Sequence, residues 1–230
     1  MTNLRDDHLW VLPVACPEPV LEAELLFAEE DPIVLGPPTS VRWSYATSKL
    51  FDEHLALRLS EERDLRVTIL RLFNAYGPRN HPTWWGGPLS LFFEEMLDGK
   101  IIELHGDGRQ VRSFTYVSDT VEGFVRSLQR PETSGEVINI GAEEPISIVK
   151  LAERVQESLG IALPLRATLL PFERMPGKYQ DVRVRIPDTT KARQMLGFEA
   201  QVSLDEGLAL TLEWVRERRA AETAAAVEVA

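Results

Sequence analysis

Tyr45 and Lys49 are the two residues of this sequence whose types and spacing best suit proton chemistry. Side chains four residues apart in a helix project from one face, about one turn apart. An ammonium beside a phenol favours the phenolate, so the tyrosine can serve as a general base or acid toward a substrate hydroxyl. That arrangement suits alcohol oxidation with hydride leaving to a nicotinamide. A solvated surface pair is the alternative interpretation of the same spacing.

Alternating helices and strands are expected to position this pair. Apolar side chains recur at helical spacing from about residue 45 to residue 62 and predict a helix there. The apolar runs at residues 66–74 and 136–141 are too continuous for half-exposed strands, so they predict parallel strands buried on both faces. Ser147 and Ser203 are suited to cap two later helices. We therefore predict an α/β fold with a parallel sheet.

An acidic charge balance argues against several kinds of partner. The 230 residues include 25 Lys and Arg against 36 Asp and Glu, a formal net charge of −11. Such a surface does not attract nucleic acid or an anionic membrane. Cys16 is the only cysteine, and the histidines lack metal-ligand spacing, so neither a disulfide nor a metal site is predicted. No apolar run reaches the roughly 18 to 20 residues of a membrane span, so we expect a cytoplasmic protein.

The sequence around the Tyr and Lys pair contains further motifs in a fixed order along the chain. In chain order these are TSVRWSYATSK, RLFNAYGPR, GDGRQVRSFTYVSD, GEVINIGAEEPISI and YQDVRVRIPDTTKARQMLGF. Together they resemble the extended short-chain dehydrogenases/reductases. Among these the chain is most similar to the NAD-dependent epimerase/dehydratase group, which acts on nucleotide sugars and includes UDP-glucose 4-epimerases and UDP-glucuronate decarboxylases. The resemblance runs from about Phe27 to about Arg216.

The resemblance implies roles at the cofactor. Tyr45 would be the catalytic acid or base, and Lys49 would lower its pKa and hydrogen-bond the nicotinamide ribose. Leu72 and Phe73, at the end of a predicted buried strand, would lie near the nicotinamide, as expected of ligands at strand carboxyl ends. The implied cofactor is NAD.

The resemblance also implies a substrate site, with a UDP-sugar as the expected substrate. Asn74 would contact the substrate diphosphate and Arg112 would pair with it, because a guanidinium fork meets phosphate oxygens two at a time. Tyr179 and Arg185 are further candidates for holding the nucleotide or the sugar. As alternatives, Asn74 starts a turn and Arg112 joins a surface ion pair.

Two family features are missing from the N-terminal part of the sequence. No glycine precedes Gly36, so the glycine-rich turn that would hold the cofactor pyrophosphate is absent. Neither Ser nor Thr occurs between Asn3 and Gly36, so no third member of the catalytic triad is assigned. We therefore expect a partial Rossmann-like sheet that lacks its N-terminal glycine-rich βαβ half, followed by a small C-terminal α/β substrate-binding lobe.

The expected organisation follows from this match. It comprises an irregular lead-in unlike the family at 1–26, the remaining Rossmann-like domain at 27–80 and 120–145, the substrate-binding lobe at 81–119 and 146–216, and a frayed tail at 217–230. Without neighbouring strands, the apolar run at 66–74 would have an open edge, which promotes self-association. We therefore expect a marginally stable chain or a homo-oligomer.

Two functional hypotheses result. The first is an NAD-dependent epimerase/dehydratase family protein that acts on a nucleotide sugar through a keto-sugar intermediate, truncated and weakly active or inactive alone. The second is a non-catalytic nucleotide-sugar-binding or interaction module, or a gene fragment. Cofactor binding by this chain alone separates the two.

Overall fold

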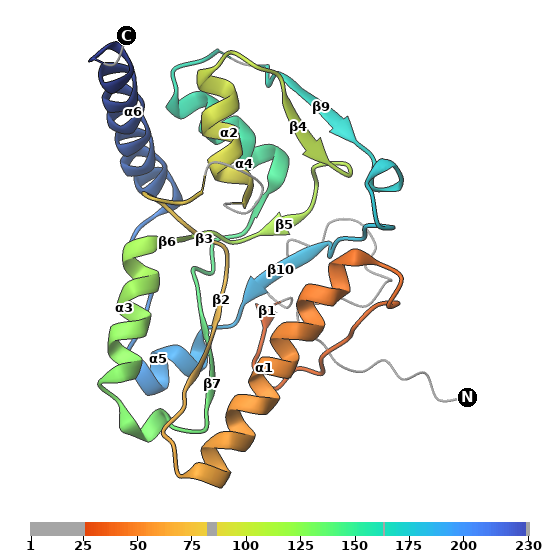
Figure 1. The fold of residues 1–230 in the computed structure, drawn as a ribbon, viewed down its shortest axis with the longest axis vertical. Coiled ribbons are helices and arrows are strands. Elements are labelled where there is room, and N and C mark those ends of the chain that lie inside the picture. Colours follow the sequence, from red (N-terminus) through yellow and green to blue (C-terminus); the bar gives the residue numbers. More distant parts are fainter. Residues whose placement is uncertain (1–25, 82–86, 163, 229–230) are drawn as a thin grey trace.

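The computed structural model describes residues 26–81, 87–162 and 164–228. It is a mixed α/β structure with parallel strands, which confirms the predicted fold class (Figure 1). The irregular lead-in expected at 1–26 lies outside the described residues except for Leu26, which begins the first strand. Within the described part, none of the helices has the length and apolar character needed to cross a membrane.

The helices and strands follow one another along most of the described chain. The α-helices are α1 (Val41–Arg63), α2 (Gly87–Leu97), α3 (Val117–Leu128), α4 (Ile148–Ser158), α5 (Thr190–Leu196) and α6 (Leu204–Glu228). The strands are β1 (Leu26–Phe27), β2 (Ile69–Leu72), β3 (Ala75–Tyr76), β4 (Ile102–His105), β5 (Val111–Arg112), β6 (Thr115–Tyr116), β7 (Val137–Ile140), β8 (Ile146–Ser147), β9 (Ala167–Leu170) and β10 (Val184–Pro187). Two short 3-10 helices, η2 and η3, cover Pro131–Thr133 and Phe172–Arg174.

The strands predicted at 66–74 and 136–141 form a parallel pair. Only β7 is largely buried as expected; β2 is partly exposed, with Leu72 at 41%, because no strand covers its other edge within the described residues. Strands β2 and β7 run side by side with Ile69 opposite Val137 and Leu72 opposite Ile140. The two isoleucines of β7 are buried against α5 and the segment after it. On its other edge, β2 has no strand partner among the described residues. The open edge expected from the sequence is therefore present in the described part of the chain.

The largest core lies among α2, α4 and α6, away from the β2 and β7 pair (Figure 1). Ser147 caps α4, since its hydroxyl accepts a hydrogen bond from the Lys150 amide. The Ser203 hydroxyl accepts one from the Glu206 amide and fixes the start of α6. Both predicted caps are confirmed. Helix α6 continues to Glu228, so most of the segment expected to fray is helical, because its alanines are strong helix formers.

Strand β10 lies at the centre of the largest described sheet. It lies between β1 and β5 in a four-stranded sheet of order β1, β10, β5, β8. The pairing places Arg185 of β10 directly opposite Arg112 of β5. Two basic residues that are far apart in the sequence thus become neighbours at the centre of this sheet.

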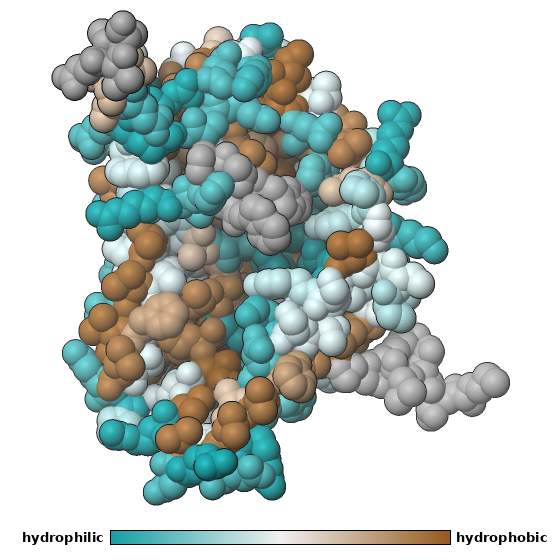
Figure 2. Space-filling model, in the orientation of Figure 1, coloured by the Kyte–Doolittle hydropathy of each residue, from teal (hydrophilic) through white to brown (hydrophobic). Residues whose placement is uncertain are grey.

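Helix α3 carries an apolar face toward solvent. Val121, Phe124, Val125 and Leu128 are all at least 40% exposed. Figure 2 shows a hydrophobic surface over this part of the molecule. Their spacing of three and four residues gathers them on one side of the helix. Helix α3 therefore keeps an apolar surface uncovered within the described residues.

Candidate active site

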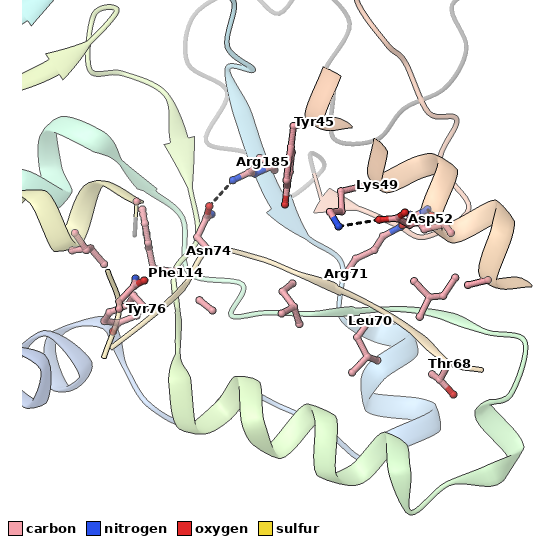
Figure 3. Close-up of a pocket in the computed structure, with 18 of the residues that line it drawn as sticks. Tyr45, Lys49, Asp52, Thr68, Leu70, Arg71, Asn74, Tyr76, Phe114 and Arg185 are labelled. Atoms are coloured by element: carbon pink, nitrogen blue, oxygen red, sulfur yellow. Dashed lines mark hydrogen bonds and ion pairs between the residues drawn. The ribbon is translucent and has the colours of Figure 1, made fainter. Parts of the chain in front are cut away.

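Helix α1 places Tyr45 and Lys49 on one face, one turn apart, as the spacing predicts. Both side chains extend from α1 toward the level of β2 (Figure 3). Lys49 Nζ lies 6.0 Å from the centre of the Tyr45 ring. The same ammonium forms an ion pair with Asp52, 3.0 Å away. That bond raises the pKa of Lys49, with a smaller contribution from the Tyr45 phenolate. The lysine thus stays charged beside the phenol.

A cavity of about 790 Å³ opens between α1 and the free edge of β2. Tyr45, Lys49 and Leu72 line it. Phe73 does not, because its side chain is only 1% exposed and packs with Phe27 in a small core cluster. Successive residues of an extended chain point to opposite faces, which separates Leu72 from Phe73. Of the two residues expected near the nicotinamide, only Leu72 reaches the cavity.

A second cavity of about 490 Å³ adjoins the first, and Tyr45, Asn74 and Arg185 line both. Arg112 and Tyr179 also line the second cavity. The Asn74 amide donates to the Ser113 carbonyl over 2.6 Å, and its oxygen accepts a hydrogen bond from Arg185. Asn74 has a φ of 43°, a left-handed conformation that asparagine tolerates, and it lies between the end of β2 and the start of β3. The turn and the binding role are therefore compatible.

We name the arginine cluster Arg42, Arg112 and Arg185, which line the second cavity together. The carboxylate of Asp181 forms ion pairs with Arg42 and with Arg112. It is the one carboxylate ion-paired with the cluster in the part of the chain that the structure describes. Three guanidiniums against one paired carboxylate leave an excess of positive charge within the cluster itself, although Glu95 and Glu103 also line the cavity.

Burial sets the electrostatics of the cluster. Desolvation lowers the pKa of Arg112, although Asp181 opposes the change. Desolvation, together with repulsion from Arg112 and Arg42, lowers the pKa of Arg185 to about 9. Arg185 therefore remains a cation at neutral pH. Its Nε is buried and finds no hydrogen-bond acceptor among the described residues. A buried donor without a partner costs free energy, which an entering anion would recover.

Tyr179 closes one side of the second cavity. Its hydroxyl accepts a hydrogen bond from Arg42 at 3.4 Å, and its ring centre lies 5.7 Å from that of Phe172. Burial raises the pKa of Tyr179, so its hydroxyl stays protonated and can donate to a ligand. An aromatic face and a hydroxyl at this position suit a nucleotide or a sugar.

The structure thus brings seven of the eight residues singled out in the sequence to the two joined cavities, the exception being Phe73. Sequence reasoning missed Arg42 and Asp181. Arg42 stands three residues before Tyr45, so helical spacing could have placed it on the same side of α1. Asp181 belongs to the YQDV segment, but nothing local shows that it pairs with α1 and β5. Within the described residues, no group of three or more potential metal ligands is present.

Known proteins resemble most of this chain. Residues 27–211 match a family model described as GDP-mannose 4,6 dehydratase. The chain is 36% identical over 192 residues to a UDP-N-acetyl-alpha-D-glucosaminuronate decarboxylase of Bacillus cytotoxicus, a match that covers 83% of this chain and 59% of the relative. It is also 36% identical to UDP-glucuronic acid decarboxylase 5 of Arabidopsis thaliana, covering 79% of this chain and 50% of the relative.

Solved structures show the same likeness in three dimensions. The UDP-glucuronic acid 4-epimerase of Bacillus cereus, in complex with UDP-glucuronic acid and NAD, superposes with a TM-score of 0.71 and 30% identity. That match covers 84% of this chain and 57% of the epimerase. A UDP-glucose 4-epimerase of Thermotoga maritima with UDP-glucose gives 0.68 and 34%, covering 76% of this chain and 53% of the epimerase. The chain spans little more than half the length of these relatives.

Proposed function

Since the chain belongs to the NAD-dependent epimerase/dehydratase family of extended short-chain dehydrogenases/reductases, we propose that it binds a nucleotide sugar, with the diphosphate in the arginine cluster. Tyr45 then exchanges a proton with a hydroxyl of the sugar. The observation that carries the proposal is the buried guanidinium of Arg185, whose Nε has no hydrogen-bond acceptor among the described residues, in a cavity that Arg112 and Tyr45 also line. A diphosphate diester brings two negative charges and phosphate oxygens that match the guanidinium fork.

The family relatives support the choice of substrate class. The two solved epimerases carry UDP-glucuronic acid and UDP-glucose, and the decarboxylases are named for UDP-linked uronates. We therefore propose a UDP-sugar as the ligand of this chain. Asn74 and Arg185 are linked by a hydrogen bond, so a diphosphate held by Arg185 would also meet the end of β2.

The residues of the larger cavity fit the nicotinamide end of NAD. A phenol, an ammonium and the apolar side chain of Leu72 meet there at the carboxyl end of a parallel strand, where such folds bind cofactors. Bound NAD would accept hydride from the carbon whose hydroxyl loses its proton. Lys49 keeps a positive charge 6.0 Å from the centre of the Tyr45 ring. In the part of the chain described here, no glycine-rich turn joins a parallel strand to a helix, so no cradle for the pyrophosphate is assigned.

Calorimetric titration of the purified chain tests the substrate proposal. UDP-glucose, UDP-glucuronic acid and UDP are expected to bind, and uridine, which lacks the diphosphate, is expected to bind far more weakly. Arg112→Lys keeps the charge but removes the fork, so UDP affinity should fall about tenfold or more. Arg174→Ala, at an exposed arginine outside both cavities, is the matched control. Equal affinity for UDP and uridine would rule out a diphosphate site.

Titration with NAD separates the catalytic proposal from the alternative of a non-catalytic binding module. Binding at micromolar concentration, or release of NAD on denaturation, favours a catalyst. Binding of UDP-sugars without NAD favours the binding module, in which the arginine cluster serves recognition alone.

We also propose that the chain forms homo-oligomers. Phe51, Leu55 and Leu59 form an apolar stripe at helical spacing on α1, each at least 38% exposed. None of these three residues lines either cavity, so self-association through the stripe would leave the cavities open. Size-exclusion chromatography with light scattering measures the oligomeric state directly.

A further inference from the structure

The segment 177–182 is fastened to the first turn of α1. The Val41 amide donates to the Gly177 carbonyl over 2.9 Å, and the Trp43 indole donates to Gln180 over 3.1 Å. Gly177 has a φ of +74°, and a Cβ there would overlap the Val41 side chain, so only glycine allows this close approach. The turn of the helix that precedes Tyr45 is therefore held by this segment.

The same segment carries Asp181, which links that helical turn to the arginine cluster. A single oxygen, Oδ1, lies 2.8 Å from Arg42 NH1 and 2.9 Å from Arg112 NH2. The Val182 amide donates to the same oxygen over 2.8 Å. Both guanidiniums have largely buried side chains, with 17% of Arg42 and 6% of Arg112 exposed. Asp181 thus divides its charge between Arg112 of β5 and Arg42 of α1.

Because Arg42 and Arg112 share one oxygen of Asp181, a change at one ion pair alters the other. An anion held between Arg112 and Arg185 neutralises Arg112 and weakens its ion pair with Oδ1, and the carboxylate then pairs more strongly with Arg42. Because Arg42 and Tyr45 lie three residues apart on one helix, a tighter bond to Arg42 holds the turn that carries Tyr45.

We propose that Arg42 is a positioning residue that couples anion binding between Arg112 and Arg185 to the placement of Tyr45 through Asp181. The inference rests on the proposed function, because the occupant is the diphosphate of a nucleotide. It assigns to Arg42 and Asp181 a role distinct from binding alone: a bound diphosphate fixes the acid or base that acts on the attached sugar. Free nucleotide diphosphate and the intact nucleotide sugar share this chemistry.

Hydrogen exchange of the full chain, measured by mass spectrometry with and without saturating UDP, tests the coupling. In the unmodified chain, UDP should slow exchange in peptides covering residues 41–49 by about fivefold or more, the lower end of usual coupling strengths. In Arg42→Ala at UDP saturation, the slowing should fall below about twofold. Arg42→Lys keeps a charge for Asp181 and should restore most of the effect. Asp181→Asn, which keeps shape and removes charge, should also abolish it.

Gln180→Ala is the matched control, because it removes a hydrogen bond between the same segment and the same helical turn without touching a charge. It should retain the slowing. If Gln180→Ala loses the effect as fully as Arg42→Ala, the segment rather than the charge link carries it, and the proposal is wrong. UDP binding without slowed exchange in the unmodified chain would refute the coupling alone. An absence of UDP binding by calorimetry would refute the proposed function, and the coupling with it.

Discussion

The ion pair between Glu53 and Arg71 joins α1 to β2 along the wall of the larger cavity. Arg71 Nε and NH2 meet the two carboxylate oxygens of Glu53 at 2.9 and 2.8 Å. The two side chains are 13% and 8% exposed. We predict that Glu53→Gln destabilises the chain more than any exposed charge substitution on α1, because it removes a carboxylate that meets the buried Arg71 guanidinium through two hydrogen bonds.

The expected magnitude follows from the geometry. Removing one partner of a buried ion pair costs about 3–5 kcal/mol. Glutamine keeps one oxygen acceptor, and Arg71 keeps its hydrogen bond to the Glu29 carbonyl, so the lower end applies. We expect the free energy of unfolding to fall by about 3 kcal/mol. For a chain of this size, that corresponds to a decrease in Tm of roughly 6–12 °C.

Guanidinium denaturation followed by circular dichroism measures the change. Glu61→Gln is the control, since Glu61 pairs with Arg58 on the same helix but both side chains are well exposed, and its loss should cost under about 0.5 kcal/mol. Replacing both partners of the buried pair, with Glu53→Leu and Arg71→Met together, should cost less than Glu53→Gln alone. A loss below about 1 kcal/mol for Glu53→Gln would refute the claim that this pair is buried and mutually dependent.

Three further outcomes are expected. Burial raises the pKa of Glu29, so its charged form destabilises the fold at neutral pH. Glu29→Gln should therefore increase the free energy of unfolding at pH 7. The gain should disappear below pH 4.5, the ordinary pKa of a glutamate, because Glu29 is then itself protonated. A gain that persists at pH 4 in urea denaturation would exclude this cause. Ser147→Ala removes the cap of α4 and should cost about 1 kcal/mol by the same assay, a loss that Ser147→Gly should largely avoid. Leu55→Asp places a charge in the exposed stripe of α1 and should shift the chain to monomer in light scattering, whereas an unchanged mass would place the contact elsewhere.

The local patterns of the sequence determined the helix of Tyr45 and Lys49, the positions of strands β2 and β7 and two helix caps, but not the exposure of β2, where Leu72 is 41% exposed. Helical spacing alone sets two side chains four residues apart on one face, and a continuous apolar run predicts a strand covered on both faces. These features depend on a window of a few residues, so no tertiary contact is needed to predict them. The ordered motifs also identified the family.

The tertiary structure decided which charges meet. Arg112 lies opposite Arg185 because β10 enters the sheet beside β5, and Asp181 reaches both Arg42 and Arg112 because the segment before β10 crosses the start of α1. Phe73, adjacent to Leu72 in sequence, is turned into the core. Strand order and long-range register are set by the burial of whole elements, which no short window of sequence contains. The sequence by itself therefore determined that Tyr45 and Lys49 share one face of a helix, and only the fold decided which arginines line the cavity beside Tyr45.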